Sequence, residues 1–419
     1  MEIDVLHALR TRKRWNQLYH AVPQGMLSGT TQVVLQWYSA FFNHYKDADR
    51  IEWDSLQTYI RMSAGPAADP DQLAITMAYV ERLKADPNEA MVMGITNKLH
   101  SLDLAGRVGT VLTAYNNGEE VELEYQLGVL IAEAKRQQQS GGVADYADAP
   151  IRSYLDSQGD AGGLQWTMFD HLALSMKGAR PGHNIAIAAP TDAGKSSLLA
   201  HFVHHWGRQG KDMFPDRPIL YLVNEGNAES LQVRLHQTVL GMTLEDMFKL
   251  SDAEIDARYD KVMGGRSRVR YKNVHGKNLI QVEQIIEAHN PYLVVSDMTG
   301  RIKAPSNKGG GKNDIGQLEE VWNGVREMAT IHDFTHLGTV QVSMEGMEML
   351  HPPLTALQDS KVGIQTTLDT CIMMGRRTDM PTLRGISTPK NKLARSKMPH
   401  LNMFESGFEP EINRWNTGG

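Results

Sequence analysis

The segment from Ala189 to Ser196 has the residue types and the spacing of a phosphate-binding loop. It reads Ala-Pro-Thr-Asp-Ala-Gly-Lys-Ser, follows an apolar stretch at 184–189 and opens a helix-like stretch at 195–209. In a strand–loop–helix unit of this kind, backbone N–H groups cradle phosphates, a lysine reaches the terminal phosphates and a serine hydroxyl holds Mg²⁺. The predicted nucleotide-binding residues are Ala189, Pro190, Thr191, Asp192, Ala193, Gly194, Lys195, Ser196 and Ser197.

The loop departs from the standard pattern at its first position, where Ala189 stands in place of glycine. The alternative is a chance Gly-Lys-Ser in an ordinary turn. A strand before the loop and a helix after it are what a phosphate-binding loop requires, and they favour the functional interpretation. We therefore predict that the chain binds a nucleoside triphosphate, with ATP and Mg²⁺ as its ligands.

A carboxylate at the end of a neighbouring strand is the second part of such a site. Asp297 ends the apolar stretch 291–297 and, together with Ser196, is predicted to hold the metal ion. The alternative is a surface aspartate that only terminates a strand.

Two further polar residues follow predicted strands. Glu225 follows the stretch 218–224 and is predicted to be the general base that activates water, although a strand-end glutamate alone is more often solvated. Gln341, in the stretch 336–342, is predicted to contact the γ-phosphate; an amide that satisfies backbone groups is the alternative.

These residues must be positioned by a sheet. From about residue 164, apolar stretches at 184–189, 218–224, 291–297, 336–342 and 369–375 alternate with helix-like segments at 195–209, 227–240, 278–289 and 315–331. This alternation predicts an α/β domain over 164–419, with a mostly parallel sheet covered by helices on both faces.

The remainder of the chain divides into two zones. Residues 1–139 are predicted to form a helical domain, because apolar residues recur at helical spacing, and Met91 and Met93 are assigned to its core. The glycine-rich segment 140–163 is predicted to be a linker. Its middle, 146–155, forms either a short docking helix or a plain tether.

The order of loop, glutamate, aspartate and glutamine resembles RecA-like ATPases, and specifically the DnaB-type replicative helicases. The matching segments are the alanine-first loop AAPTDAGKSS, the glutamate segment YLVNEGNAESLQVRL, the glutamine strand HLGTVQVS, the loop and strand LQDSKVGIQTTLDTCIMMGR and the hairpin PKNKLARSKMPHLNMFESGF. Together they cover about 160 to 412. The helical zone and linker are similar in layout to the N-terminal domain and hinge of that family.

The resemblance implies a hexameric ring that binds ATP between subunits, moves along single-stranded DNA and unwinds forked DNA, with a primase or helicase loader as a possible partner. Lys390 and Lys392 match the Lys and Arg finger positions of the hairpin, which complete the site of a neighbouring subunit. Because the second position is lysine here, either Lys392 or Arg395 is the finger. Phe404 corresponds to an aromatic residue that stacks on the base, with core packing as the alternative.

Basic loops are the predicted contacts to DNA. The segment 301–312 carries Arg301, Lys303, Lys308 and Lys312 without an acidic residue. Lys361 matches the DNA-contact loop of the family, and the segment 376–397 holds seven basic residues and one acidic residue. Clustered positive charge suits sequence-independent binding of the phosphate backbone, although any single patch can be only a solvated face.

The composition sets limits on these interpretations. The chain has 419 residues, a formal net charge of −6 and one cysteine, which excludes a disulfide framework, a Cys-type zinc site and hence a fused zinc-ribbon primase. An acidic chain is not a general polyanion binder, so DNA contacts must be local. The start of the chain has no apolar signal region and no stretch is long enough to span a membrane, so we expect a cytoplasmic protein. The resemblance to DnaB-type helicases implies the cytosol of a bacterium or phage-infected bacterium, with a phage- or plasmid-encoded protein as one form of it.

Two other functions fit the loop. One is a RecA- or RadA-like recombinase or other DNA-stimulated ATPase without unwinding activity. The other is a P-loop switch or kinase unrelated to DNA. Strand displacement from a forked substrate and the response of ATP turnover to DNA separate all three.

Overall fold

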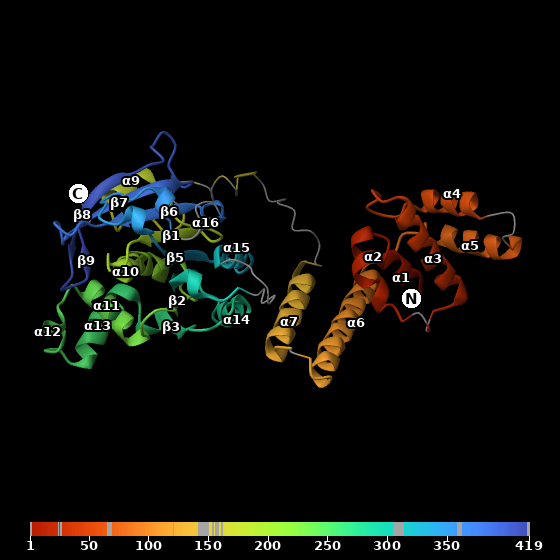
Figure 1. The fold of residues 1–419 in the computed structure, drawn as a ribbon, viewed down its shortest axis with the longest axis horizontal. Coiled ribbons are helices and arrows are strands. Elements are labelled where there is room, and N and C mark those ends of the chain that lie inside the picture. Colours follow the sequence, from red (N-terminus) through yellow and green to blue (C-terminus); the bar gives the residue numbers. More distant parts are fainter. Residues whose placement is uncertain are drawn as a thin grey trace. The chain divides into compact units, whose positions relative to one another are not determined.

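The structure is a computed structural model that describes residues 2–416 except 24, 26, 65–68, 120, 141–150, 153–154, 156–158, 161, 305–313 and 358–362. It divides into two compact units, Met1–Ala147 and Asp148–Gly419 (Figure 1). The predicted docking helix at 146–155 lies largely outside the described residues.

The described part of the first unit is helical, as predicted. Its elements are α1 (Glu2–Ala8), α2 (Arg12–Leu18), η1 (Tyr19–Ala21), α3 (Gly29–His44), α4 (Trp53–Ser63), α5 (Pro70–Arg82), α6 (Glu89–Asn116) and α7 (Leu123–Ser140). Side chains of Ser28, Asp69 and Asn88 accept backbone N–H groups at the first turns of α3, α5 and α6, which fixes where these helices begin.

The core of this unit is rich in aromatic residues, and two methionines predicted to belong to it lie outside it. Trp15, Tyr38 and Phe42 are buried in it. The assignment of Met91 and Met93 to the core is wrong, because these side chains are 49% and 45% exposed. They lie in the first turns of α6, before that helix reaches the buried Leu99.

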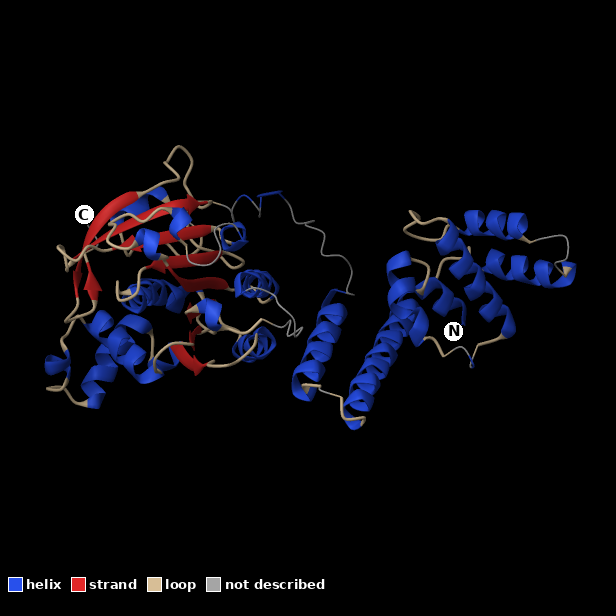
Figure 2. Ribbon diagram, viewed as in Figure 1, coloured by secondary structure: helices blue, strands red, loops and turns tan. Residues whose placement is uncertain are grey.

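The described residues of the second unit form a nine-stranded sheet, in the order β3-β2-β4-β5-β1-β6-β7-β8-β9 (Figure 2). All pairs from β3 to β6 are parallel, and those from β6 to β9 are antiparallel. The strands are β1 (Asn184–Ala189), β2 (Ile219–Val223), β3 (Val269–Asn273), β4 (Leu293–Asp297), β5 (Thr335–Gln341), β6 (Thr370–Gly375), β7 (Leu383–Asn391), β8 (Met403–Glu409) and β9 (Arg414–Trp415).

Helices cover both faces of this sheet (Figure 2). The α-helices are α9 (Asp170–Ser175), α10 (Lys195–Met213), α11 (Ala228–Leu240), α12 (Leu244–Met247), α13 (Asp252–Met263), α14 (Leu279–His289), α15 (Asp314–Ile331) and α16 (Gly363–Thr367). Alternate residues of β1 enter opposite cores: Ile185 and Ile187 pack in the core that contains residues of α10, whereas Ala186 and Ala188 pack in the core that contains Trp322 of α15. The predicted α/β class with a mostly parallel sheet is confirmed.

A buried polar chain crosses the middle of the sheet. The His336 ring on β5 makes hydrogen bonds with Ser296 Oγ on β4 and Asn184 Oδ1 on β1, both at 2.7 Å. Complete burial lowers the pKa of His336 to about 3, so the ring is neutral near pH 7. The backbone N–H of Asn184 continues the chain by donating to Asp369 Oδ2 at 3.0 Å.

Candidate nucleotide-binding site

The loop between β1 and α10 has the backbone shape of a phosphate cradle. Asp192 and Gly194 have positive φ values of 57° and 105°, and Gly194 caps the start of α10. At that φ a glycine avoids the strain that a Cβ would cause. The conformation turns the chain sharply from strand to helix, which leaves the N-terminus of the 19-residue helix α10 beside the loop.

Lys195 lies inside this loop. Its Nζ donates to the carbonyl oxygens of Ala189 at 3.3 Å and Pro190 at 3.0 Å, and the residue is only 8% exposed. Burial lowers the pKa of Lys195, against the opposing effect of Asp297, Glu225 and Asp192. A cation held only by neutral carbonyls can turn to a phosphate, because a charge-assisted bond is stronger than a bond to a neutral carbonyl.

Two arginines hold the loop from the other side of β1. Arg384 on β7 is buried and its Nε donates to the carbonyl of Ala193 at 2.9 Å, while Arg376 Nη1 donates to the carbonyl of Asp192 at 2.9 Å. Both contacts fix peptide groups of the loop. Arg384 was not predicted as part of the site; its signal in the sequence is a single cation within the otherwise uncharged stretch 383–388.

Ser196 and Asp297, the two residues predicted to hold a metal ion, are in contact. Ser196 Oγ donates to Asp297 Oδ2 at 2.7 Å, and Thr339 Oγ1 donates to Asp297 Oδ1 at 3.1 Å. Burial raises the pKa of Asp297, whereas these two hydrogen bonds lower it. A hydroxyl and a carboxylate are oxygen ligands of the kind Mg²⁺ prefers alongside phosphates, so the residues fit this ion. Thr339 was not predicted.

Glu225 and Gln341 lie, like the loop, at the carboxyl ends of the strands. Val223 pairs with Asp297, so Glu225 follows β2 two residues beyond the level of the metal-binding carboxylate. Gln341 pairs with Ala189, the last residue of β1. The sheet thereby gathers all the predicted phosphate, metal and water-activating residues along the carboxyl ends of adjacent strands, where ligands bind in open α/β sheets.

The Glu225 side chain makes an ion pair that the sequence did not predict. Arg301 Nη2 donates to Glu225 Oε1 at 3.1 Å, and the two side chains are 50% and 43% exposed. Arg301 is thus the one predicted DNA residue for which a contact with the nucleotide site is described. Lys303 is exposed nearby in the chain, whereas Lys308, Lys312 and Lys361 lie outside the described residues.

The candidate finger residues lie near the other ends of the parallel strands, the amino ends. Lys392 Nζ is 3.3 Å from Asp369 Oδ1 and the Lys392 side chain is 52% exposed. Arg395 instead turns inward, with Nε donating to the carbonyl of Met176 at 2.9 Å. Burial, followed by the charge of Lys392, lowers the pKa of the partly buried Lys390.

Phe404 is packed within its own unit. The residue is 7% exposed, and its ring lies 4.8 Å from the His171 ring in a stacked arrangement and 5.3 Å from Phe169. This environment favours the core-packing alternative for Phe404 over a contact with the nucleotide base.

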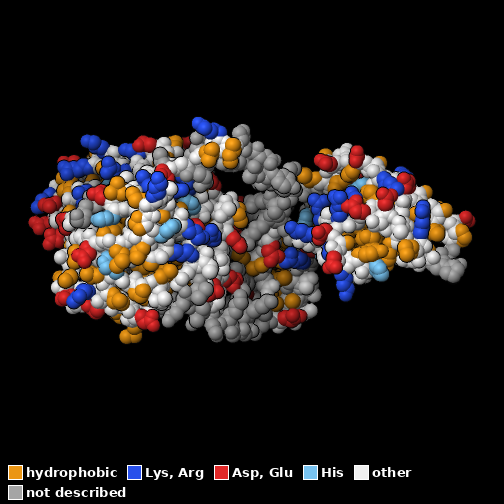
Figure 3. All heavy atoms as spheres, turned by 90° about the horizontal axis from the view of Figure 1, so that it is seen from above, with side chains coloured by type: hydrophobic (Ala, Val, Ile, Leu, Met, Phe, Trp, Pro, Cys, Tyr) orange, Lys and Arg blue, Asp and Glu red, His pale blue; other side chains and the backbone are white. Residues whose placement is uncertain are grey.

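The exposed face of the second unit in Figure 3 mixes charges. Lys and Arg side chains are interspersed there with acidic and apolar ones. A contact with a polyanion on this face therefore depends on individual cations. Among the described helices, none is both long enough and apolar enough to cross a membrane.

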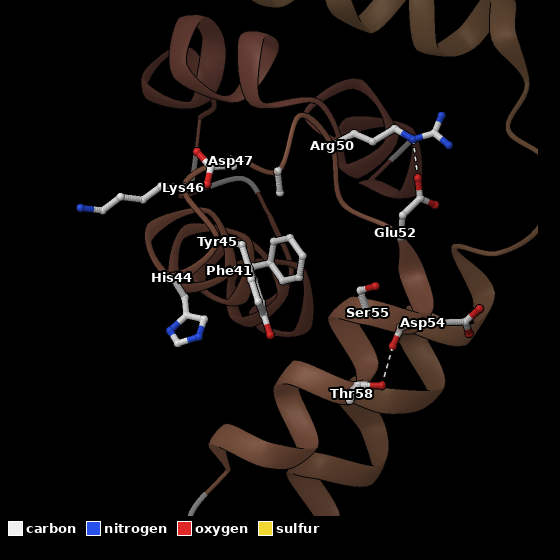
Figure 4. Close-up of a pocket in the computed structure, with 11 residues that line it drawn as sticks. Phe41, His44, Tyr45, Lys46, Asp47, Arg50, Glu52, Asp54, Ser55 and Thr58 are labelled. Carbon is white, nitrogen blue, oxygen red and sulfur yellow. Dashed lines mark hydrogen bonds and ion pairs between the residues drawn. The ribbon is translucent and has the colours of Figure 1, made fainter.

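The first unit has an open cavity of about 780 Å³ among its described residues (Figure 4). The Phe41 and Tyr45 rings lie 4.8 Å apart on one side, and Arg50 pairs with Glu52 on another. The lining residues are Phe41, His44, Tyr45, Lys46, Asp47, Ala48, Arg50, Glu52, Asp54, Ser55 and Thr58, which include none of the predicted site residues.

Comparison with known proteins agrees with this geometry. Residues 156–347 match the AAA domain family. A solved structure of an isolated ATPase domain is 14% identical, with a TM-score of 0.51, and the match covers 63% of this chain and 95% of that one. A DnaB-like replicative helicase, described with its interactions with primase, is 13% identical, with a TM-score of 0.60 over 100% of this chain and 99% of that one. No curated protein matches the sequence.

The structural matches confirm, at the level of fold, the resemblance inferred from the motifs. At 13–14% sequence identity, these matches show a shared fold and do not show a shared activity. Together with the position of Lys195 inside its loop and the Ser196–Asp297 contact, they show that the second unit has the fold of that ATPase domain and of the DnaB-like replicative helicase.

Proposed function

We propose that this protein is an ATP-dependent replicative DNA helicase, which assembles as a hexameric ring, moves along single-stranded DNA and unwinds duplex DNA at a fork. The observation that supports the proposal is that the predicted catalytic residues lie at two opposite ends of the strands of one sheet. The phosphate loop, Asp297 and Glu225 lie at the carboxyl ends of the parallel strands, and Lys392 is exposed near their amino ends. Such an arrangement suits a site completed by a second subunit.

Hydrolysis at the carboxyl ends of the strands uses residues that the sheet brings together. Glu225 accepts a proton from water as the water oxygen bonds to the γ-phosphorus and the bond to the β–γ bridging oxygen breaks, so that ADP leaves with that electron pair. Lys195 stabilises the charge on the phosphate oxygens. Mg²⁺ held through Ser196 and Asp297 neutralises phosphate charge when it is bound. Gln341 is positioned to respond when the γ-phosphate departs.

Lys392 cannot serve the phosphate loop of its own subunit. Its backbone N–H donates to Asp369, whose N–H in turn donates to Asn184 at the start of β1, whereas the loop follows Ala189 at the end of that strand. Five residue steps of a strand span about 16 Å, more than a lysine side chain reaches. A neighbouring subunit is therefore the site that Lys392 can complete, and it supplies a point charge rather than a bidentate fork.

Replacing Lys392 with alanine is expected to lower ATP turnover about 100-fold or more, because a missing trans cation leaves transition-state charge unbalanced. Arg395→Ala is expected to lower thermal stability, since its guanidinium holds Met176, with turnover per folded protein close to that of the parent. Steady-state phosphate release and thermal melting measure the two effects.

A mixing experiment tests whether the cation acts in trans. Subunits carrying Lys392→Ala retain Lys195, and subunits carrying Lys195→Ala retain Lys392, so a mixed ring contains interfaces with both groups. Each variant alone is expected to be inactive and their mixture active. Co-purification of differently tagged subunits verifies mixing; mixed rings without turnover would refute a trans role for Lys392.

Strand displacement tests the function itself. The protein with ATP and Mg²⁺ is expected to separate a forked duplex, to form rings in particle images and to hydrolyse ATP faster with a single-stranded oligonucleotide. DNA-stimulated turnover without strand displacement indicates the recombinase-like alternative. A monomer whose turnover ignores DNA indicates the P-loop switch or kinase.

Partners and location follow from the same proposal. The DnaB-like helicase compared above is described with primase, so a primase or a helicase loader is the protein partner to test by co-purification with the full chain. The segment 146–155 is the element proposed to dock on the adjacent subunit. A replicative role places the protein in the bacterial or phage-infected bacterial cytosol.

A further inference from the structure

The ion pair between Arg301 and Glu225 connects two parts of the molecule that the proposed function treats separately. Glu225 is the general base of that proposal, and Arg301 begins the basic segment assigned to DNA. The guanidinium occupies Oε1 of the carboxylate at 3.1 Å. The guanidinium occupies one of the two carboxylate oxygens and fixes the orientation of the group, so release of Arg301 frees Glu225 to turn toward a water molecule.

The backbone that carries Arg301 is anchored to the metal site. Met298, directly after Asp297, has a left-handed φ of 60°, and its N–H donates to Thr339 Oγ1 at 2.6 Å. The same hydroxyl donates to Asp297. The short helix η4 (Thr299–Arg301) follows at once, so the base of the Arg301 side chain is fixed relative to the nucleotide site.

The residues directly before and after Arg301 are also tightly packed. A Cβ at Gly300 would collide with Leu318 of α15, and Ile302 is buried. The N–H of Lys303 donates to the carbonyl of Lys277, and the carbonyl of Lys303 accepts from Leu279 at the start of α14. With the backbone held on both sides, only the exposed side chain of Arg301 is free to exchange partners.

We propose that Arg301 is a positioning residue that holds Glu225 until a phosphate of single-stranded polynucleotide takes its place, which couples strand binding to ATP hydrolysis. The inference rests on the proposed function. A phosphate is a suitable competitor, because the planar guanidinium binds phosphate oxygens as well as carboxylate oxygens. Exposed ion pairs are weak, so the exchange needs only one well-placed phosphate.

The first test measures ATP turnover with and without a single-stranded oligonucleotide. Arg301→Ala is expected to raise the unstimulated rate and to lower the ratio of stimulated to unstimulated turnover, each by about two- to fivefold, the range that an exposed ion pair allows. Nucleotide affinity, measured with a fluorescent ATP analogue, is expected to stay unchanged. Arg301→Lys keeps the charge but not the fork and is expected to fall between the two.

Arg266→Ala is the matched control. Arg266 also forms an exposed ion pair in this unit, 3.3 Å from Asp256, with side chains that are 60% and 36% exposed. Its removal deletes the same residue type without touching Glu225, so neither the unstimulated rate nor the stimulation is expected to change.

The second test needs no hydrolysis. If Glu225 and a polynucleotide phosphate compete for Arg301, Glu225→Ala is expected to tighten binding of a single-stranded oligonucleotide about two- to fivefold without nucleotide. The gain is expected to vanish in the double variant with Arg301→Ala, which makes the effect a coupling between these two residues. Fluorescence anisotropy of a labelled oligonucleotide gives all four affinities.

The outcomes separate this inference from the function on which it rests. If the parent protein shows no stimulation by single strands, the proposed function fails. If the parent is stimulated and Arg301→Ala keeps the same unstimulated rate and the same ratio, only the role of Arg301 is overturned. Loss of unstimulated turnover in Arg301→Ala also overturns it, because Arg301 would then support Glu225 instead of withholding it.

Discussion

Lys195→Ala is expected to abolish measurable ATP turnover and to weaken nucleotide binding about 10- to 100-fold, the effect of deleting one hydrogen bond to a charged group. The side chain is buried within the loop, where it donates to two backbone carbonyls. The loss of turnover is expected to exceed the loss of affinity, reaching about two to three orders of magnitude, because charge grows on the phosphate oxygens in the transition state. Fluorescent-analogue titration and phosphate release measure the two quantities.

Lys211→Ala is the control for this variant. Lys211 lies in the last turn of the same helix, where its Nζ donates to the carbonyl of Lys261. The change removes one positive charge from α10 at the end remote from the loop, so affinity and turnover are expected to match the parent. Equal losses in both variants would point to a general effect of charge on α10 and remove Lys195 from its assigned role.

Glu225→Gln is expected to retain ATP binding and to lower turnover about 10²- to 10⁴-fold, the usual contribution of a general base. Glutamine has nearly the same shape and its amide oxygen can still accept from Arg301, so the local structure is preserved. Only the capacity to take a proton is lost. Binding of the fluorescent analogue together with single-turnover hydrolysis distinguishes this result from unfolding.

Glu229→Gln supplies the comparison for the base. Glu229 is exposed in the first turn of α11, four residues after Glu225, and carries the same charge. Its turnover is expected to equal that of the parent. If Glu225→Gln hydrolyses ATP as fast as Glu229→Gln, Glu225 does not activate water.

The sequence predicted the strands of the parallel sheet that are buried on both faces. The stretches at 184–189 and 369–375 correspond to β1 (Asn184–Ala189) and β6 (Thr370–Gly375), because an uninterrupted apolar run bounded by turn residues has few other solutions. The edge strand β3 escaped prediction. Its sequence VRYKN has one buried residue and pairs only with β2, so it lacks the apolar run that marks its neighbours.

The residues of the candidate site were predictable where the neighbouring sequence alone identifies them. The loop residues, Asp297 and Glu225 each follow a recognisable strand. Contacts between distant segments were not predictable: Arg384 donates to a carbonyl 191 residues away, and Arg395 to one 219 residues away. The sequence therefore left Lys392 and Arg395 as equal candidates, and the fold is what distinguishes the inward arginine from the half-exposed lysine.

Strand β7 acts as a rigid spacer. Arg384 near its start fixes the phosphate loop of its own subunit, and Lys392 directly follows its end. The eight residue steps between them extend about 27 Å in a strand. In the proposed ring, the two ends of this one strand would serve two different nucleotide sites. Deleting one residue within β7 reverses the direction of the strand residues that follow it. If Lys392 acts on a neighbouring subunit as proposed, such a deletion is expected to disturb two sites while removing no residue of either.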